Sequence, residues 1–400
     1  MSKPGRTFER SFNRYNILNS IRTAGMISRI DIARSLDLAK ASLTSITADL
    51  INEGLIFEKE AGAYQVGRRP ILLAINPDGA HAVGVSISMK QIEVVIINFQ
   101  AEIKTSYAMP LEKGIYSPEE LTKKIMDAIG TCISKSGFPD KRISGIGISI
   151  PGLVDSSSGI IRYMPNYGWM DVNLRELLQD KTKHPVFIDN DANIITIAEH
   201  WFGSGKGSDN FMVIVLENGI GAGYVLNGRI MRGNFGMAGE FGHMSINQDG
   251  PLCRCGKRGC VEAYAGIYTI VKDAQEVIRN RMGKRPVKKD MLFSDVIIKA
   301  RDDNPELIKI FDNAGNMLGF GISQLVILLN PEKIILTGTG AQAEDLLFKP
   351  MFESIKRNLS DKLSRYQTDI LIKPSTDEAF AKGAGTLVLQ EIYKSPAIKH

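Results

Sequence analysis

Residues 239–264, GEFGHMSINQDGPLCRCGKRGCVEAY, place three of the chain's four cysteines in one turn-rich loop. Cys253, Cys255 and Cys260 lie in this loop, and His243 precedes them. Three thiolates and one imidazole are the ligands of a closed tetrahedral zinc site, which is structural because no ligand position is left open for water. We therefore expect these four residues to bind a structural Zn²⁺. The alternative is a loop of cysteines that binds no metal.

The composition is that of a globular chain. With 400 residues, of which 44% are hydrophobic and 23% are charged, two or three domains are expected. The longest apolar stretches, such as ISQLVILL, are too short to span a bilayer, and the N-terminal MSKPGRTFERSF lacks the apolar core of a signal peptide. Four cysteines, three of them clustered, do not make a disulfide framework. We expect a cytoplasmic protein with no membrane partner.

The N-terminal segment RYNILNSIRTAGMISRIDIARSLDLAKASLTSITADLINEG has helical spacing throughout. Gly25 breaks the first helix, and Ser28 with Asp31 three positions later can form a capping box for a short second helix. A tight turn at Asp37 then leads to a third helix. These lengths are typical of a helix-turn-helix, and the next stretch, GLIFEKEAGAYQVGRRPILLAINP, predicts two strands around a glycine-containing loop, the wing of a winged helix.

The third predicted helix has a polar face suited to DNA. Its side chains can reach base edges and phosphates: Lys40, Ser42, Thr44 and Ser45. Arg68 and Arg69 in the predicted wing are available for a narrow groove. Residues 1–75 contain eleven Lys or Arg against seven Asp or Glu, so most of the chain's net charge of +5 lies there. The alternative is a three-helix domain that binds another protein.

From about residue 80 the pattern changes to strands and helices in alternation. A hairpin is predicted for AVGVSISMKQIEVVIINFQAEI and a buried strand for ISGIGISIPGLVD. The same order, a hairpin and then a strand, is predicted again for FMVIVLENGIGAGYVLNGRI and EKIILTGTG. Two such halves indicate an internal duplication with a cleft between two lobes. In such sheets ligands bind at the carboxyl ends of strands, which is where residues 189–191 and the glycine turn 338–340 fall.

Two glutamates, Glu240 and Glu262, stand on either side of the predicted metal loop. A loop fixed by metal can hold them and the outer nitrogen of His243 toward the cleft, where carboxylates accept hydrogen bonds from vicinal hydroxyls. Asn190 and Asp191 from the other lobe complete a set suited to a polyol. The alternative is that the two glutamates are solvated loop charges.

Four motifs together resemble the ROK family of repressors and sugar kinases: G-E-x-G-H at 239–243, C-x-C-G-x-x-G-C-x-E at 253–262, D-N-D-A-N at 189–193 and GRRP at 67–70. An I-P-G-L-V-D stretch followed by M-P-N-x-x-W is most similar to the xylose-repressor branch. The resemblance implies an α/β chain in which an N-terminal winged helix-turn-helix precedes a two-lobed, actin-like ATPase fold. It implies a DNA-binding domain at 1–76, a first lobe at 80–195 with a returning helix at 380–395, and a second lobe at 196–380 with the zinc loop. It also implies a sugar effector bound by Asn166, Asn190, Asp191, Glu240, His243 and Glu262.

The resemblance leaves an ATP-dependent sugar kinase as the alternative function. Asp191 matches the aspartate that activates a sugar hydroxyl in the kinases of the family. Those kinases carry D-x-G-G-T in the first hairpin, where amides and a carboxylate hold phosphate and Mg²⁺, but residues 86–90 here read SISMK. At the second glycine turn Glu217 and Asn218 replace the kinase G-T, so an acidic side chain would repel a triphosphate. We therefore expect a repressor that is not an enzyme and binds no ATP.

The expected partners are operator DNA and a small sugar. A homodimer or homotetramer would place two winged helices on an inverted repeat, and sugar would release the operator by closing the two lobes. The resemblance favours xylose, while glucose, other hexoses and N-acetylated sugars bind similar sets of carboxylates. A phosphotransferase-system protein as the signal, and activation in place of repression, stay open as alternatives.

Overall fold

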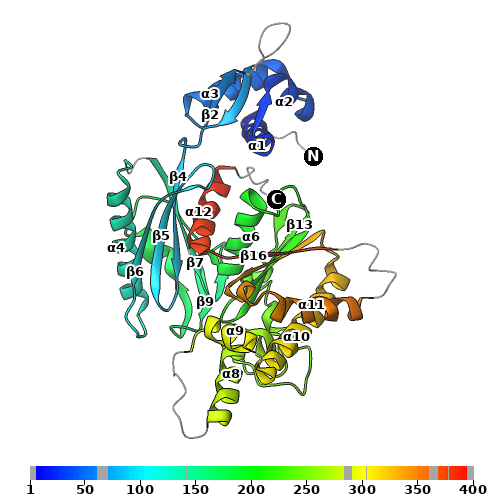
Figure 1. Ribbon diagram of the computed structural model, residues 1–400. Coiled ribbons are helices and arrows are strands. Elements are labelled where there is room, and N and C mark those ends of the chain that lie inside the picture. Colours follow the sequence, from blue (N-terminus) through cyan, green and yellow to red (C-terminus); the bar gives the residue numbers. More distant parts are fainter. Residues whose placement is uncertain are drawn as a thin grey trace. The chain divides into compact units, whose positions relative to one another are not determined.

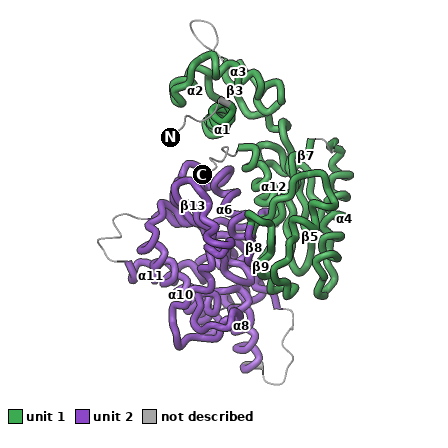
Figure 2. The backbone as a smooth tube through the Cα atoms, turned by 180° about the vertical axis from the view of Figure 1, so that it is seen from behind, with its two compact units in different colours: residues 1–152, 156–189, 380–400 green, residues 153–155, 190–379 purple. Residues whose placement is uncertain are grey.

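The computed structural model describes residues 6–60, 71–139, 142–282, 291–302, 304–359, 368–376 and 378–393. The chain forms two compact units, which Figure 2 shows in green and purple. Unit 1 consists of residues 1–152, 156–189 and 380–400, and unit 2 consists of residues 153–155 and 190–379. Within the described residues, every helix is too short or too polar to cross a membrane.

The N-terminal part of unit 1 is a helical head with a small sheet (Figure 1). Its elements are α1 (Arg6–Ala24), β1 (Met26–Ser28), α2 (Arg29–Leu36), α3 (Lys40–Asn52), β2 (Ile56–Glu60) and β3 (Ile71–Ile75). The strands pair antiparallel in the order β1-β3-β2. Three helices followed by a hairpin are the elements of the predicted winged helix, and the predicted wing residues Arg68 and Arg69 lie outside the described residues.

Local sequence signals set the limits of α2. The Ser28 hydroxyl accepts a hydrogen bond of 3.2 Å from the Asp31 N–H and caps the helix. The same hydroxyl donates to the Asp31 carboxylate at 2.6 Å, so the cap is present but the reciprocal half of the predicted capping box is not. Asp37 ends the helix in the left-handed region with φ of 50°, which makes the tight turn before α3.

The rest of unit 1 contains a five-stranded sheet of order β11-β7-β4-β5-β6 with helices against it, and β9 and β10 pair antiparallel outside this sheet. Its elements are β4 (His81–Ile87), β5 (Gln91–Asn98), β6 (Ile103–Pro110), α4 (Pro118–Ser136), β7 (Ile143–Ile150), β9 (Ile160–Met164), β10 (Trp169–Asn173), α5 (Leu174–Gln179), β11 (Val186–Asn190) and α12 (Ala379–Ile392). α12 lies directly on β4 and β7, because a Cβ on Gly84 would be 1.9 Å from the Ala381 carbonyl oxygen and one on Gly147 would be 1.8 Å from that of Ala384. Glycine at both positions is what allows this close approach.

Unit 2 contains the second five-stranded sheet, of order β14-β13-β12-β15-β16. Its elements are β8 (Leu153–Asp155), α6 (Asp191–Phe202), β12 (Phe211–Leu216), β13 (Ile220–Leu226), β14 (Arg229–Ile230), η2 (Asn234–Gly236), η3 (Phe241–His243), α7 (Glu262–Ala265), α8 (Ile267–Met282), α9 (Phe293–Arg301), α10 (Pro305–Leu329), β15 (Lys333–Gly338), η4 (Thr339–Ala343), α11 (Asp345–Asn358) and β16 (Asp369–Pro374). A large apolar core joins the sheet to the helices, with Phe311 of α10 and Ile334 of β15 fully buried in it.

The two sheets repeat one strand order, which confirms the predicted duplication. In each, an antiparallel hairpin (β4 with β5, β12 with β13) is extended by a parallel strand (β7 beside β4, β15 beside β12). A third antiparallel strand lies beyond each hairpin, β6 in unit 1 and β14 in unit 2. The carboxyl ends of β12 and β15 therefore lie side by side, and the loops that follow them can meet.

Candidate functional site

The loop after η3 brings the predicted metal ligands together. The donor atoms of His243, Cys253, Cys255 and Cys260 all lie within 4.8 Å of one another. Cys253 Sγ is 3.6 Å from His243 Nδ1, and Cys255 Sγ is 3.7 Å from Cys260 Sγ. Tetrahedral zinc with Zn–S bonds of about 2.3 Å places two sulfurs about 3.8 Å apart, so the donor set fits this ion.

Contacts within the chain hold the backbone of this loop together. Cys260 is fully buried, and its backbone pairs with that of Ser245 in an isolated antiparallel β-bridge. Lys257 Nζ donates to the His243 carbonyl oxygen at 2.9 Å. Gly259 has φ of 65°, and a Cβ there would be 1.6 Å from the Asn247 carbonyl oxygen. Burial raises the pKa of the Cys260 thiol to about 12, so a cation is needed to hold it as a thiolate near neutral pH.

The two nitrogens of His243 face different groups. Nδ1 faces the Cys253 sulfur, and Nε2 lies 3.9 Å from Glu240 Oε2. A metal bound at Nδ1 leaves Nε2 with its hydrogen as a donor. With a metal at Nδ1, the outer edge of this loop would present an imidazole N–H beside the Glu240 carboxylate, whose side chain is 39% exposed.

The start of α6 provides a second polar group within unit 2. Asn190 is buried and caps the helix by accepting a hydrogen bond of 2.8 Å from the Asn193 N–H. Asp191 is the first residue of the helix, and its Oδ1 accepts from the Ala192 N–H at 2.8 Å. Burial, and to a smaller extent the charges of Glu217 and Glu240, raise the pKa of Asp191 to about 6. These carboxylates are therefore near enough to interact.

Glu262 is held by a partner that the sequence analysis did not identify. Its Oε2 accepts a hydrogen bond of 3.0 Å from the Ile220 N–H, and its Oε1 accepts from Arg254 Nη2 at 2.9 Å. Arg254 Nη2 also donates to the Asn218 carbonyl oxygen at 3.2 Å, so it joins the metal loop to the β12–β13 turn. Oε1 also accepts from Arg254 Nε at 3.3 Å, whereas Oε2 accepts from the Ile220 N–H, so Oε2 is the oxygen whose second lone pair can accept a hydroxyl.

Glu217 at the end of β12 binds the glycine turn after β15. Its Oε1 accepts from the Thr339 N–H and its Oε2 from the Thr339 hydroxyl, both at 2.8 Å. The first hairpin turn is closed in a similar way, because the Ser88 hydroxyl accepts from the N–H groups of Lys90 and Gln91 at 3.2 and 3.1 Å. In both turns, backbone donors are used within the chain.

Asn166 belongs to unit 1, on the exposed turn between β9 and β10, while the other five predicted effector residues belong to unit 2. The neighbouring turn residues are anchored by aromatic contacts, with the ring centroids of Tyr167 and Trp169 5.5 Å apart. The structure therefore places Asn166 on a fixed turn of its own unit.

The DNA-binding residues predicted on α3 share one exposed face. Lys40, Ser42, Thr44 and Ser45 are exposed, while Leu43, Ile46, Thr47 and Leu50 are buried on the opposite face. The Ser45 hydroxyl accepts from Arg10 Nη2 of α1 at 3.2 Å, and Arg10 also pairs with Asp49. This adds an exposed guanidinium to the predicted DNA-binding face, which sequence spacing did not indicate because Arg10 is on another helix.

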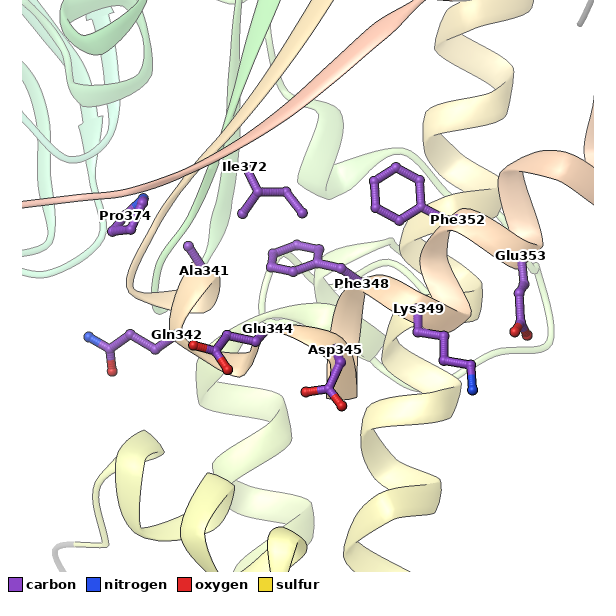
Figure 3. Close-up of a pocket in the computed structure, with 10 residues that line it drawn as sticks. All are labelled: Ala341, Gln342, Glu344, Asp345, Phe348, Lys349, Phe352, Glu353, Ile372 and Pro374. Carbon is purple, nitrogen blue, oxygen red and sulfur yellow. The ribbon is translucent and has the colours of Figure 1, made fainter.

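An open hollow of about 870 Å³ lies along η4 and α11 (Figure 3). The rings of Phe348 and Phe352 and the side chain of Ile372 form its apolar part, and the carboxylates of Glu344 and Asp345 lie at its rim. Its lining, drawn from the described residues, contains none of the predicted effector residues. We therefore do not assign the sugar to this hollow.

Residues 82–391 match the sequence profile described as the ROK family. The chain is 30% identical to the xylose repressor of Caldicellulosiruptor bescii, over 98% of each chain. It is 29% identical to the DNA-binding transcriptional dual regulator NagC of Escherichia coli, covering 94% of this chain and 92% of that protein. These similarities extend through the N-terminal head, which precedes the ROK match.

Two kinds of solved structure resemble the protein. A ROK family transcriptional regulator, a homologue of the E. coli MLC protein, matches with a TM-score of 0.82 at 27% identity over 96% of this chain and 97% of that chain. The ROK hexokinase of Thermus thermophilus matches with a TM-score of 0.65 at 27% identity, over 78% of this chain and 99% of that chain. The regulator thus matches nearly the whole chain, whereas the hexokinase matches only part of it.

Proposed function

Because the chain belongs to the ROK family, we propose that it is a sugar-responsive, DNA-binding repressor of carbohydrate-utilisation genes. The observation that carries this proposal is the similarity to a xylose repressor and to a transcriptional regulator over nearly the full length, head included. We assign residues 1–76 to DNA binding, residues 80–195 with α12 to the first lobe, and residues 196–380 to the second lobe with the metal loop. This proposed lobe boundary differs from that of the compact units, in which residues 190–195 belong with the metal loop. The protein acts in the cytoplasm as a homodimer or homotetramer.

The exposed face of α3 is the part of the head that would enter the major groove. It combines hydroxyl groups with Lys40, and Arg10 lies beside it. Hydroxyls and cations of this kind contact base edges and phosphates. Two such heads in a symmetric dimer would read an inverted repeat.

The effector is a sugar whose hydroxyls are bound by the carboxylates and amides already described. Asp191, Glu240 and Glu262 offer acceptors, and His243 Nε2 offers a donor once its other nitrogen binds Zn²⁺. Asn166 and Asn190 complete the proposed set. D-Xylose is the first candidate and N-acetylglucosamine the second, since the relatives are named for a xylose repressor and an N-acetylglucosamine repressor.

The metal would fix the loop that carries these groups. His243, Cys253, Cys255 and Cys260 would hold Zn²⁺ as a structural ion, which supplies a rigid support and no chemistry. Arg254 and Glu262 then pass this rigidity to the β12–β13 turn. We propose no role for ATP.

Two observations support a sensor over a kinase. Glu217 holds the Thr339 turn with both carboxylate oxygens, where a phosphate would need the same N–H. Ser88 likewise takes the N–H groups of the first hairpin turn. Nucleotide phosphates would have to displace these contacts and approach the charge of Glu217.

The kinase alternative rests on Asp191. A pKa of about 6 suits a general base that takes a proton from a sugar hydroxyl at neutral pH. Formation of ADP from MgATP with D-xylose or N-acetylglucosamine, lost in Asp191→Asn, would establish this activity. The repressor proposal predicts no ADP above the no-sugar control.

The proposal is tested by a thermal-shift series on the purified protein. D-Xylose, N-acetylglucosamine, glucose, allose and fructose are each added with and without MgATP. A sugar at a hundred times its Kd stabilises the folded state by about 2.7 kcal/mol. We expect one sugar to raise the melting temperature and MgATP to add nothing, whereas a shift with MgATP alone would contradict the sensor. If no sugar raises the melting temperature, direct sugar sensing is contradicted and a protein signal becomes the next candidate.

A further inference from the structure

The head is attached to the first lobe at two places within unit 1, and the linker is the first. Asn76 donates from its backbone N–H to the Leu55 carbonyl oxygen at 2.9 Å and from its side chain to that of Gly54 at 2.7 Å. The next residue, Pro77, accepts a hydrogen bond of 2.8 Å from the Phe99 N–H, just after β5. The linker is thus bonded to the head on one side and to the lobe on the other.

The second attachment is at the end of α12, which points toward α1 in Figure 1. Asn19 of α1 donates from Nδ2 to the Tyr393 carbonyl oxygen at 3.3 Å. The Arg22 guanidinium lies 5.7 Å from the centroid of the Tyr393 ring, and Arg22 Nε donates to Asn19 Oδ1 at 3.2 Å. Two α1 residues on one helix face therefore bind a single residue at the end of α12.

Tyr393 is also anchored on its lobe side. Its side chain is fully buried, and its ring stacks on Phe99 with centroids 4.7 Å apart and planes at 16°. Phe99 is the same residue that bonds the linker at Pro77. Both attachments therefore involve Phe99. Tyr393 is held by α1 on one side and by the Phe99 ring on the other.

α12 connects this contact to the sheet that leads to the effector residues. The glycine contacts at Gly84 and Gly147 leave no space between the helix and strands β4 and β7. In the same sheet β11 lies next to β7, and β11 ends at Asn190, one of the proposed sugar ligands. A shift of these strands must move α12 or lose its packing.

We infer that Arg22 and Tyr393 are positioning residues that pass the effector state of the lobes to the DNA-binding head. The contact sets the orientation of α1, and through the core of the head it sets that of α3. Ile21 of α1 and Leu50 of α3 are both fully buried in this core. This inference rests on the proposed function, because it needs both an effector and an operator.

The test measures the coupling between sugar binding and operator binding, and sugar affinity without DNA serves as the control. The operator probe is a fluorescent duplex selected by the native protein from a random-sequence library, and the sugar probe is D-xylose, with N-acetylglucosamine in a parallel series. The coupling factor is the ratio of duplex Kd values with and without saturating sugar. Factors of roughly 5- to 150-fold are typical of allosteric proteins.

We expect Arg22→Met and Tyr393→Leu to bring the coupling factor toward one. Sugar affinity measured without DNA should stay native, because neither residue is among the proposed sugar ligands. Tyr107→Leu is the matched control, since Lys135 lies 4.4 Å from the centroid of the Tyr107 ring, a cation–aromatic pair of the same unit between β6 and α4. It should keep the native factor.

The outcomes separate the inference from the function it rests on. A native coupling factor above one that survives unchanged in Arg22→Met and Tyr393→Leu would overturn the inference alone. A native factor of one for both sugars would overturn the proposed function and the inference with it. If Tyr393→Leu fails to fold, Arg22→Met decides, because methionine keeps the helical propensity of α1.

Discussion

Asp191→Asn is predicted to make the protein more stable at neutral pH while it removes sugar binding. Burial raises the pKa of Asp191 from 3.8 to about 6, so the folded state binds this proton more tightly than the unfolded state does. Unfolding then releases a proton between these pKa values, and the free energy of unfolding falls as the pH rises through this window. Asparagine has no charge to bury, so the free energy of unfolding of the variant does not fall with rising pH for this reason.

The magnitude follows from the shift. At about 1.36 kcal/mol per pKa unit, the whole shift corresponds to roughly 3 kcal/mol, of which about 2 kcal/mol falls between pH 4.5 and 7.5. Water reaches part of the Asp191 side chain, so about 2 kcal/mol is an upper value. Asparagine can still accept the hydrogen bond from the Ala192 N–H, so the substitution changes charge more than geometry.

The assay is urea unfolding at several pH values, followed by the fluorescence of Trp201. This residue lies on the same helix as Asp191, and Trp169→Phe removes the other of the two tryptophans. The stability gain of Asp191→Asn should grow by about 1 to 2 kcal/mol from pH 4.5 to 7.5. A gain for Asp191→Asn that is the same at every pH would refute the reasoning.

Further outcomes are expected elsewhere in the chain. Gly84→Ala puts a methyl group 1.9 Å from the Ala381 carbonyl oxygen and should destabilise unit 1 by about 1 to 3 kcal/mol, seen as a lower melting temperature. Asn190→Ala removes a helix cap worth about 1 kcal/mol and should also weaken sugar binding in calorimetry. Lys40→Ala should weaken operator binding and reduce the slope of log K against log salt by about one. Cys260→Ser should lower the zinc content below one ion per chain by elemental analysis, and full zinc retention would contradict the ligand set.

The predictions that succeeded rest on local patterns. Strand alternation and glycine turns are properties of short stretches, so the two hairpins and the duplicated strand order could be read from the sequence. The clustering of the three cysteines with His243 was visible for the same reason, because a turn-rich loop closes over few residues. Ser28 as the cap of α2 was predicted from a three-residue spacing.

The contacts that the sequence did not reveal join distant positions. Glu217 and Thr339 are 122 residues apart, and Asn19 and Tyr393 are 374 apart. Nothing near Glu217 indicates that its carboxylate binds a turn, and sequence reasoning assigned it repulsion of ATP alone. Arg254 was missed as a link because its bond to the Asn218 carbonyl oxygen, 36 residues away, forms only when the β12–β13 turn and the metal loop are brought together.

The central claim is that one chain binds sugar and operator and that each weakens the other. The most direct test is a calorimetric titration of D-xylose, with N-acetylglucosamine in parallel, into the native protein alone and into the protein saturated with its selected duplex. We expect the sugar Kd of the duplex-bound protein to be higher than that of the free protein. The factor should equal the one by which sugar weakens duplex binding, as linkage requires. The same sugar Kd with and without duplex would contradict the account.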